Sequence, residues 1–285
     1  MRCFRRTILA SLLLFAAAGA RAQDKAAPGL PRTFPGVSSV LWIAAHPDDE
    51  VLAAPLLSRL CLDEGLRCSF LIFTHGEKGD CFLPGGCRPD LGTVRAAEMA
   101  RAAQLFHAGL TLWSLPDSGS APDGSAGSWD AAAGSHDALL ASLRSVITQA
   151  HADLVLTFDP RHGSSCHPDH RAVGGLVREA ISTMRKPPGA TYLLETRLVE
   201  QGSPVMIDFV PAASARAGAF AFDGNPGWKI TNADVQIHAS QFDARLRRAV
   251  SRVPTAERAV FLGPADLLLA SSDVWDCLAQ GSGEP

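Results

Sequence analysis

Short apolar runs alternate with longer amphipathic segments along most of the chain. The apolar runs are typical of strands covered on both faces and predict strands at 37–45, 67–74, 111–115, 153–158, 191–199 and 205–210. Apolar positions three and four residues apart predict helices at 50–63, 91–107, 135–150, 168–184 and 232–250. Pro168 stands at the first turn of one of these helices, where its missing N–H costs no hydrogen bond.

This alternation favours one α/β domain that occupies residues 37–285. We expect a Rossmann-like, doubly wound and mostly parallel sheet with helices on both faces. Residues 116–134 are rich in small and polar residues and predict a loop beside the site. Residues 200–285 are expected to be an extension of the same domain.

The first 36 residues differ from the rest in composition. Residues 1–22 combine an arginine-rich start, an apolar stretch at 8–18 and the small residues Ala20 and Ala22, which is the pattern of a secretory signal peptide. The apolar stretch is too short to cross about 30 Å of hydrocarbon. Residues 23–36 are rich in Pro and Gly and predict an extended leader. We therefore expect an exported protein, periplasmic or secreted, without a membrane span.

Composition and charge narrow the class of partner. With 47% hydrophobic and 19% charged residues, the chain has the composition of a folded protein. Its formal net charge is −3, and it has no stripe of Lys and Arg that would match a phosphate backbone. We expect a small-molecule or glycan substrate and no nucleic acid, and the oligomeric state stays open.

The interpretation of the cysteines depends on the expected export. Cys3 falls in the signal peptide, and six others remain. An even number in an oxidising compartment favours disulfides, although six cysteines allow 15 connectivities. The pairings we favour are Cys81 with Cys87, then Cys61 with Cys68, and Cys166 with Cys277 by elimination. A cluster of zinc-bound thiolates is the alternative, but no CxxC spacing supports it.

Two short segments rich in His, Pro and Asp follow predicted strands. AHPDDE at 45–50 comes directly after the first strand, and HPDH at 167–170 comes after the fourth. A single such segment could simply cap a helix, because Pro suits the first turn and Asp suits the helix N-terminus. In a doubly wound sheet, however, the first and fourth strands are neighbours where ligands bind. Two copies at that edge therefore favour a functional site.

The residue types in these segments match a catalytic zinc site. Two imidazoles and a carboxylate, from His46, Asp49 and His170, can bind one zinc ion per chain and leave a position for water. Asp48, beside that water, is the candidate general base. His167 is the candidate to protonate the leaving group or to stabilise an oxyanion. Such ligand sets also bind iron or cobalt.

The motifs resemble those of the PIG-L/LmbE family of zinc-dependent deacetylases, which act on N-acetylglucosamine-type amines. The resemblance continues through THGEKGD at 74–80, RAAE at 95–98, Pro-Asp-Ser at 116–118 and TFDPRHG at 157–163, and ends with HASQ at 238–241. It covers residues 38–250, and the two HPD motifs carry most of its specificity.

The resemblance also implies roles for individual residues. It places zinc on the three ligands given above, with Asp48 as general base, and gives Asp169 the task of orienting a neighbouring histidine. Arg95 matches a substrate-binding arginine, and Asp117 matches a contact to a sugar hydroxyl. Glu98 follows Arg95 by three residues on one helix face, and we expect it to hold that arginine.

The sequence is compatible with three functions. The first is an N-acetyl amino-sugar deacetylase, in which Asp48 accepts a proton from the attacking water. The second is a zinc amidase or esterase that acts on a non-sugar substrate, because the zinc chemistry does not depend on what the amine carries. The third is a secreted glycan-binding relative without activity.

Overall fold

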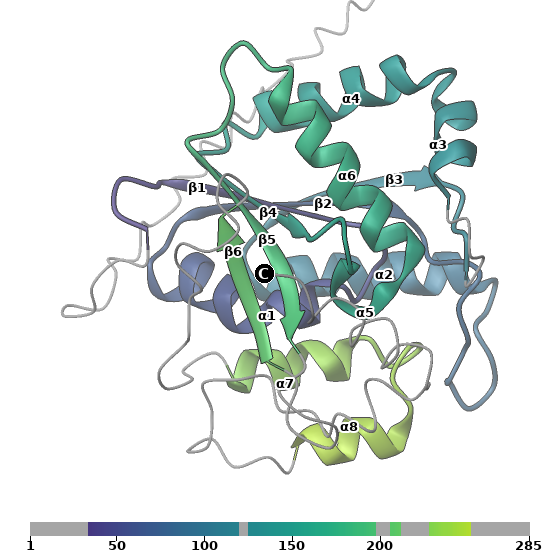
Figure 1. The fold of residues 1–285 in the computed structure, drawn as a ribbon. Helices are drawn as coiled ribbons and strands as arrows, with labels where there is room; N and C mark the ends of the chain where they lie inside the picture. The colour runs from purple at the N-terminus through teal and green to yellow at the C-terminus, as the bar shows by residue number, and fades with distance from the viewer. Residues whose placement is uncertain (1–33, 120–124, 198–205, 212–227, 252–285) are drawn as a thin grey trace, which may run out of the picture.

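A six-stranded sheet forms the centre of the computed structural model (Figure 1). The structure describes residues 34–119, 125–197, 206–211 and 228–251. The strands are β1 (Ser39–Ala44), β2 (Arg67–Thr74), β3 (Gly109–Leu115), β4 (Leu154–Phe158), β5 (Ala190–Arg197) and β6 (Met206–Pro211). All six lie within two residues of the apolar runs that predict them.

The strand order is β3-β2-β1-β4-β5-β6. Strands β1 to β5 pair in parallel, and β6 pairs antiparallel to β5. The direction of winding reverses between β1 and β4, which pair directly through Val40 and Leu154. This is the strand order of a doubly wound Rossmann-like sheet, so the predicted fold class is confirmed.

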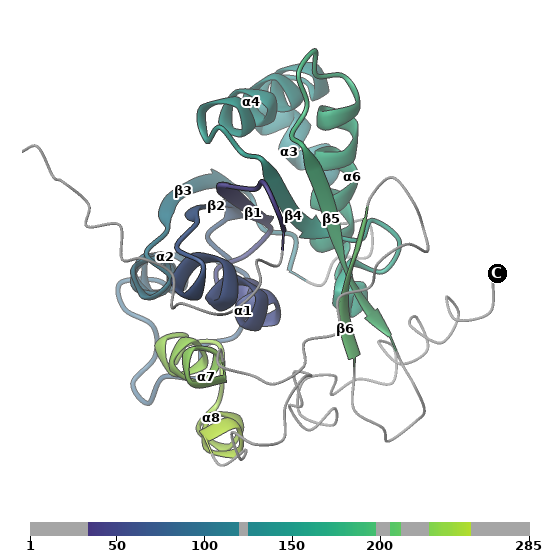
Figure 2. The ribbon, with the colours of Figure 1, turned by 90° about the vertical axis from the view of Figure 1, so that its left-hand side faces the viewer.

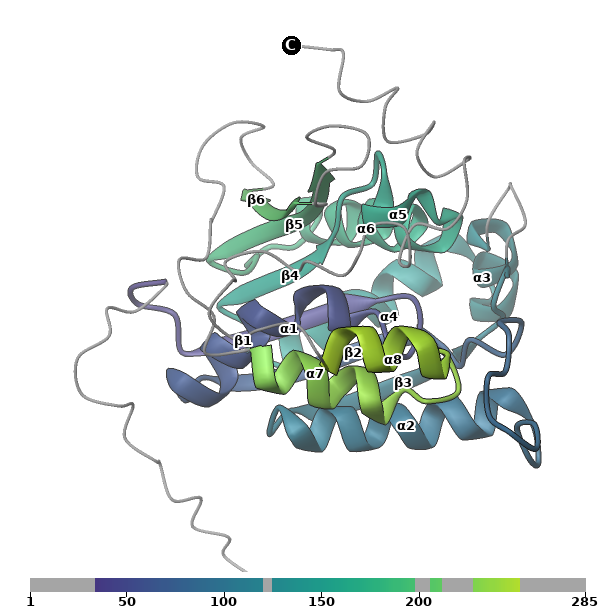
Figure 3. The same ribbon diagram turned by 90° about the horizontal axis from the view of Figure 1, so that it is seen from below.

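Helices cover both faces of the sheet (Figures 1 and 2). They are α1 (Glu50–Ser58), the π-helical turn η1 (Arg59–Asp63), α2 (Leu91–Leu105), α3 (Ala126–Ala133), α4 (His136–Gln149), α5 (Gly163–Cys166), α6 (Pro168–Ser182), α7 (Trp228–Ile237) and α8 (Ala244–Ser251). Helices α3, α4 and α6 lie on one side and α1 and α2 on the other, while α7 and α8 lie beyond α1 and α2 (Figure 3). Among the described residues, no helix has both the length and the apolar character needed to cross a bilayer.

Two hydrophobic cores follow from the alternation of side chains along each strand. On β1, Val40 and Trp42 face the core shared with α1 and α2, whereas Leu41 and Ile43 face the core under α3, α4 and α6. Strand side chains point to opposite faces in turn, so an almost wholly apolar strand fits a sheet buried on both sides.

One predicted loop and one predicted helix are wrong in detail. Residues 116–134 are not all loop, because α3 lies within them and buries Trp129 completely. Small residues around Trp129 hide the helical period. The helix predicted at 232–250 is interrupted after Ile237, and a new helix begins beyond Asp243. The Asp243 carboxylate accepts the Arg245 N–H, a capping contact that marks a helix start.

Two of the predicted disulfides are present. Cys61 bonds to Cys68 at the start of β2, and Cys81 bonds to Cys87 in the loop between β2 and α2. Cys166 is also disulfide-bonded, which excludes the thiolate cluster for these cysteines. Its predicted partner Cys277 lies outside the described residues.

Other predictions for the chain ends also lie outside the described residues. These are the signal peptide at 1–22, most of the leader at 23–36 and most of the extension at 200–285.

Candidate active site

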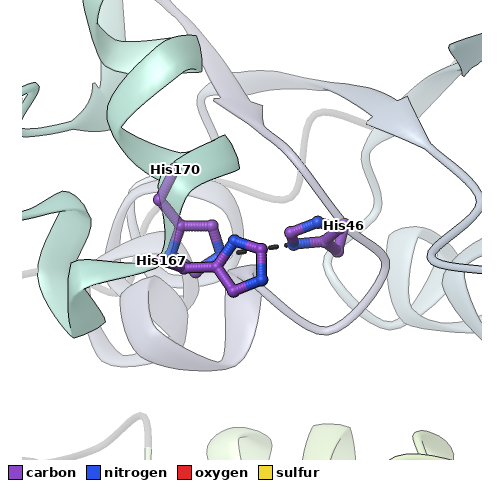
Figure 4. A group of neighbouring side chains, drawn as sticks. All are labelled: His46, His167 and His170. Carbon is purple, nitrogen blue, oxygen red and sulfur yellow. Dashed lines mark hydrogen bonds between the residues drawn. The ribbon is translucent and has the colours of Figure 1, made fainter. Parts of the chain in front are cut away.

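The two HPD segments meet at the carboxyl ends of β1 and β4. His46 follows β1 by two residues, and His167 and His170 lie at the start of α6. Figure 4 shows the three imidazoles converging from these two elements. The Phe158 ring, at the end of β4, stacks on His170 with the ring centroids 4.1 Å apart. The topology therefore joins segments more than 100 residues apart in the sequence, as predicted.

The turn at 45–50 is organised by its own carboxylates. One Asp49 oxygen accepts the backbone N–H groups of Ala45 and His46 at 2.9 and 2.7 Å. Asp48 has a φ of 105°, a conformation that residues other than glycine rarely adopt. Side chains of adjacent residues are thereby turned to different sides: Asp49 faces the histidines, and Asp48 faces Arg95.

Hydrogen bonds fix the tautomer of His170. Its Nδ1 lies 2.9 Å from the Gly163 carbonyl oxygen, which can only accept, so Nδ1 carries the proton and Nε2 has the lone pair. Gly163 has a φ of +54°, and a Cβ there would lie 2.7 Å from the His170 Cβ. Glycine is therefore required for this carbonyl to reach the imidazole.

His46 is oriented by two buried carboxylates. Its Nε2 lies 3.2 Å from Asp169 Oδ2 and 3.4 Å from Asp117 Oδ1, so this nitrogen keeps its proton, and Nδ1 is the atom that can give a lone pair to a metal ion once it is deprotonated. Burial by itself lowers the pKa of His46, but hydrogen bonds with carboxylates, Asp117 first, raise it well above the ordinary value. The surroundings of this imidazole therefore stabilise positive charge.

Three lone-pair donors face one another at the centre of the cluster. His46 Nδ1 lies 3.3 Å from His170 Nε2. Asp49 Oδ1 lies 2.9 Å from His170 Nε2, and Asp49 Oδ2 lies 3.7 Å from His46 Nδ1. Donor atoms around a tetrahedral zinc ion, each about 2.0–2.2 Å from the metal, lie about 3.3–3.5 Å apart. The donor types suit a zinc ion held by the three predicted ligands, and the spacing of the two imidazole nitrogens matches that of two ligands of one ion.

The two adjacent carboxyls of this turn differ in pKa. Burial raises the pKa of Asp48, which the charge of Arg95 opposes and the charge of Asp49 reinforces. Burial also acts to raise the pKa of Asp49, but its contacts with His170 lower it well below the ordinary value. A carboxylate that stays ionised suits a ligand, and a carboxyl with a raised pKa suits a general base near neutral pH.

His167 is the N-cap of α6. Its Nδ1 accepts the Asp169 backbone N–H at 3.2 Å, so Nε2 carries the proton of the neutral ring. Burial, with the charge of His170 next, lowers the pKa of His167 to about 3. The ring lies edge-on to His46 with centroids 4.7 Å apart. His167 is therefore a neutral hydrogen-bond donor beside the ligand cluster.

Arg95 is buried and holds the turn that carries the general-base candidate. Its guanidinium donates to the carbonyl oxygens of Gly76 and Pro47, each at 2.7 Å, and to Asp48 Oδ1 at 3.0 Å. Gly76 has a φ of +63°, and a Cβ there would overlap this guanidinium. The predicted contact between Arg95 and substrate stays a prediction.

Glu98 and Asp117 also have partners that the sequence analysis does not anticipate. Both Glu98 oxygens accept from Ser240, one from its N–H and one from its hydroxyl, so Glu98 holds this segment and not Arg95. Asp117 is 3% exposed and accepts the Lys78 N–H in addition to its contact with His46. The predicted contact between Asp117 and a sugar hydroxyl stays a prediction.

One group of buried ionisable side chains is not predicted from the sequence. Glu50, Asp234 and His238 are each fully buried, and His238 Nε2 contacts Glu50 Oε1. Burial lowers the pKa of His238, but the charge of Glu50 raises it to about 9, so His238 donates to Glu50 as a cation. Glu50 lies in the motif AHPDDE and His238 in the motif HASQ, and these motifs are the feature of the sequence that could have indicated the pair.

Comparison with known proteins places this site in a family. The family model described as PIG-L, GlcNAc-PI de-N-acetylase, matches residues 41–181, which include both HPD motifs and all three predicted zinc ligands. The chain belongs to the PIG-L family. The predicted resemblance is confirmed.

PIG-L relatives with assigned names match about half of the chain. The 1D-myo-inositol 2-acetamido-2-deoxy-alpha-D-glucopyranoside deacetylase of Rhodococcus opacus is 32% identical over 155 residues, 50% of this chain and 52% of the relative. The probable N-acetyl-alpha-D-glucosaminyl L-malate deacetylase 2 of Bacillus cereus is 27% identical over 158 residues, 52% of this chain and 62% of the relative. The chain thus spans about half to three fifths of the length of these relatives.

Solved structures show the same fold at low sequence identity. The N,N'-diacetylchitobiose deacetylase of Pyrococcus horikoshii has a TM-score of 0.54 and 17% identity, over 74% of this chain and 73% of that one. GalB, the 4-carboxy-2-hydroxymuconate hydratase of Pseudomonas putida KT2440, has a TM-score of 0.52 and 19% identity, over 75% and 83%. These proteins have different activities, so function must be argued from the site.

Proposed function

We propose that this protein is a zinc-dependent hydrolase that removes the acetyl group from an N-acetylated amino sugar of the N-acetylglucosamine type. The observation that carries the proposal is the convergence of lone pairs from His46, Asp49 and His170, with the Asp48 carboxyl beside them. Membership of the PIG-L family supports this function, as do the names of relatives that act on acetylated glucosamine derivatives.

The cluster can supply each part of amide hydrolysis. A bound zinc ion polarises the amide carbonyl and makes water more acidic. Arg95 engages Asp48 Oδ1, and we assign Asp48 Oδ2 to accept the proton of the attacking water. Asp48 then returns this proton to the amine nitrogen as the C–N bond breaks, which releases acetate and the free amine.

His167 is assigned to the oxyanion and not to proton transfer. Its Nδ1 accepts the Asp169 N–H, so the Nε2–H is the group that can donate to the oxygen that becomes negative. With a pKa of about 3 the ring is neutral near neutral pH, so it lacks the second proton that a general acid would transfer. Of the two roles predicted for His167, the geometry therefore supports the second.

Arg95 and Asp117 are assigned to positioning. Arg95 has three acceptors within the protein, and a group committed in this way holds Asp48 in place. Asp117 joins Asp169 on His46 Nε2, and this pair of carboxylates strengthens the imidazole as a ligand.

We also propose that the protein is exported, periplasmic or secreted. The pattern of residues 1–22 suggests a signal peptide, and the bonds Cys61–Cys68 and Cys81–Cys87 suit an oxidising compartment. An extracellular or envelope glycan is then the favoured substrate class. Fewer than two free thiols are expected in the denatured, unreduced protein purified from its native compartment, and a count near six would contradict the proposal.

The experiment that tests the function measures acetate release from N-acetylglucosamine, its oligomers and glycan polymers. Asp48→Asn serves as the inactive reference, and Asp137→Asn, an exposed carboxyl on α4, is the matched control that keeps full activity. Zinc-dependent release by the wild type and by Asp137→Asn supports the proposal.

Two other outcomes would point to the alternatives. Cleavage of non-sugar amides or esters in place of the sugars would indicate the amidase or esterase. Binding of a glycan without any release would indicate a binding protein.

A further inference from the structure

A group of buried ionisable side chains lies where α1 contacts α7. Glu50 begins α1, Asp234 is on α7 and His238 directly follows it, and all three are 0% exposed. His238 Nε2 donates to Glu50 Oε1 and lies 3.7 Å from Asp234 Oδ1. The function proposed above uses none of these three groups.

Glu50 connects this group to the active site. Its second oxygen, Oε2, accepts the backbone N–H of Asp48 at 3.2 Å. The positive φ of Asp48 is unfavourable for a residue with a Cβ, so this turn needs contacts that hold it. A chain of hydrogen bonds thus runs from His238 through Glu50 to the backbone of the general-base candidate.

The burial of these three ionisable side chains costs free energy, and hydrophobic packing alone does not explain why they are there. Both Asp234 oxygens and His238 Nδ1 have no hydrogen-bond partner among the described residues. Buried polar atoms without partners are unfavourable and rare in folded proteins. Glu50 Oε1 and His238 Nε2 lie 2.5 Å apart, which is shorter than an ordinary N–H···O hydrogen bond and too short for two ligands of one metal ion.

We propose that His238 is a positioning residue for the hydrolytic reaction. It holds Glu50 so that Glu50 fixes the Asp48 N–H, while Arg95 fixes the Asp48 carboxylate from the other side. The proposal rests on the proposed function, because it takes Asp48 as the general base.

The test combines kinetics with a measurement that needs no substrate. His238→Ala should speed hydrogen exchange at the Asp48 amide and lower kcat by roughly 10²-fold, since a small misplacement of a reacting group has about this effect. KM and zinc content should not change. His238→Gln, whose side-chain N–H can still donate to Glu50, should restore most of kcat and of the amide protection.

Val235→Ala is the matched control, because Val235 is buried on α7, three residues before His238, and its side chain has no polar atom. It should lower the melting temperature without changing kcat or Asp48 exchange. If His238→Ala does not fold, His238→Asn gives the same contrast, because its shorter amide cannot reach Glu50.

Unchanged exchange at Asp48 in His238→Ala, or in His238→Asn where that variant replaces it, would overturn the proposal, as would an equal loss of kcat in Val235→Ala. A second metal equivalent in the wild type that His238→Ala removes would also overturn it, since the group would then be a metal site. If the wild type releases no acetate from any substrate, the proposed function fails, and Asp48 exchange alone still decides whether His238 holds the turn.

Discussion

At the scale of single residues, the neighbouring carboxyls of Asp48 and Asp49 acquire different chemistry from their surroundings. Asp49 faces His170 at 2.9 Å, and its pKa is lowered. Asp48 is turned toward Arg95, and burial raises its pKa in spite of that charge. The positive φ of Asp48 makes this divergence possible.

Asp48→Asn should lower kcat by about 10²–10⁴-fold, because the amide cannot accept the proton of water. Zinc content should stay at the wild-type level, since the amide faces Arg95 and not the ligand cluster. Acetate release and metal analysis on the same samples check both parts. An unchanged rate would show that Asp48 is not the base.

Asp169→Asn should weaken zinc binding by about 10–100-fold, the usual effect of removing a carboxylate that supports a histidine ligand. The asparagine side chain has no negative charge, so it supports the N–H at His46 Nε2 less strongly than the Asp169 carboxylate does. Titration with a competing chelator measures the affinity. If the affinity stayed at the wild-type value, Asp117 alone would be sufficient to support His46.

The sequence indicates the ligands and, through the family resemblance, the support that Asp169 gives to a histidine, but not the more distant contacts. His46, Asp49 and His170 stand in compact motifs whose residue types predict a zinc site. Glu98, by contrast, binds Ser240, which lies 142 residues away in the sequence. Such a pairing depends on how α2 meets the segment after α7, and residue spacing within one helix cannot reveal it.

At the scale of elements, His136 links three helices. It begins α4, and its ring lies 3.0 Å from Asp130 on α3 and 3.1 Å from Glu179 on α6. Hydrogen bonds with these carboxylates, Glu179 first, raise the pKa of His136 above its ordinary value. The protonated ring is therefore favoured in the folded state.

This linkage predicts a pH-dependent contribution to stability. Because the folded pKa is raised, the contribution is complete below the unfolded pKa of about 6.5 and is lost as the pH rises through the folded value. The melting temperature of His136→Gln should therefore fall further below the wild type at pH 6 than at pH 9. The difference should be small because the His136 side chain is 43% exposed and solvent screens its charge. Equal differences at both pH values would contradict this account.

Sequence periodicity predicts the elements of the sheet better than those outside it. Strands such as β1 are almost wholly apolar and easily recognised. Helix α3 is short and made largely of small residues. Its one large buried side chain, Trp129, produces an apolar periodicity that is too weak to predict a helix. The break before α8 depends on the capping contact of Asp243, which the apolar pattern does not register.

At the scale of the whole molecule, the strand order determines where the chemistry lies. Pairing of β1 with β4 brings the two HPD segments to one edge of the sheet, and this could be predicted from the alternation of strands and helices. The contribution of α7 could not, because its polar residues act only after it packs against α1. A segment late in the sequence thus supports a site formed by earlier ones.

The most direct test of the central claim is a metal titration of activity. The protein is stripped of metal, zinc is added in steps, and acetate release from an N-acetylglucosamine substrate is measured at each step. Release should rise linearly and level off at one zinc per chain, and His170→Ala should show no such rise. Full release by the metal-free protein, or a rise in His170→Ala equal to that of the wild type, would contradict a zinc-dependent deacetylase built on His46, Asp49 and His170.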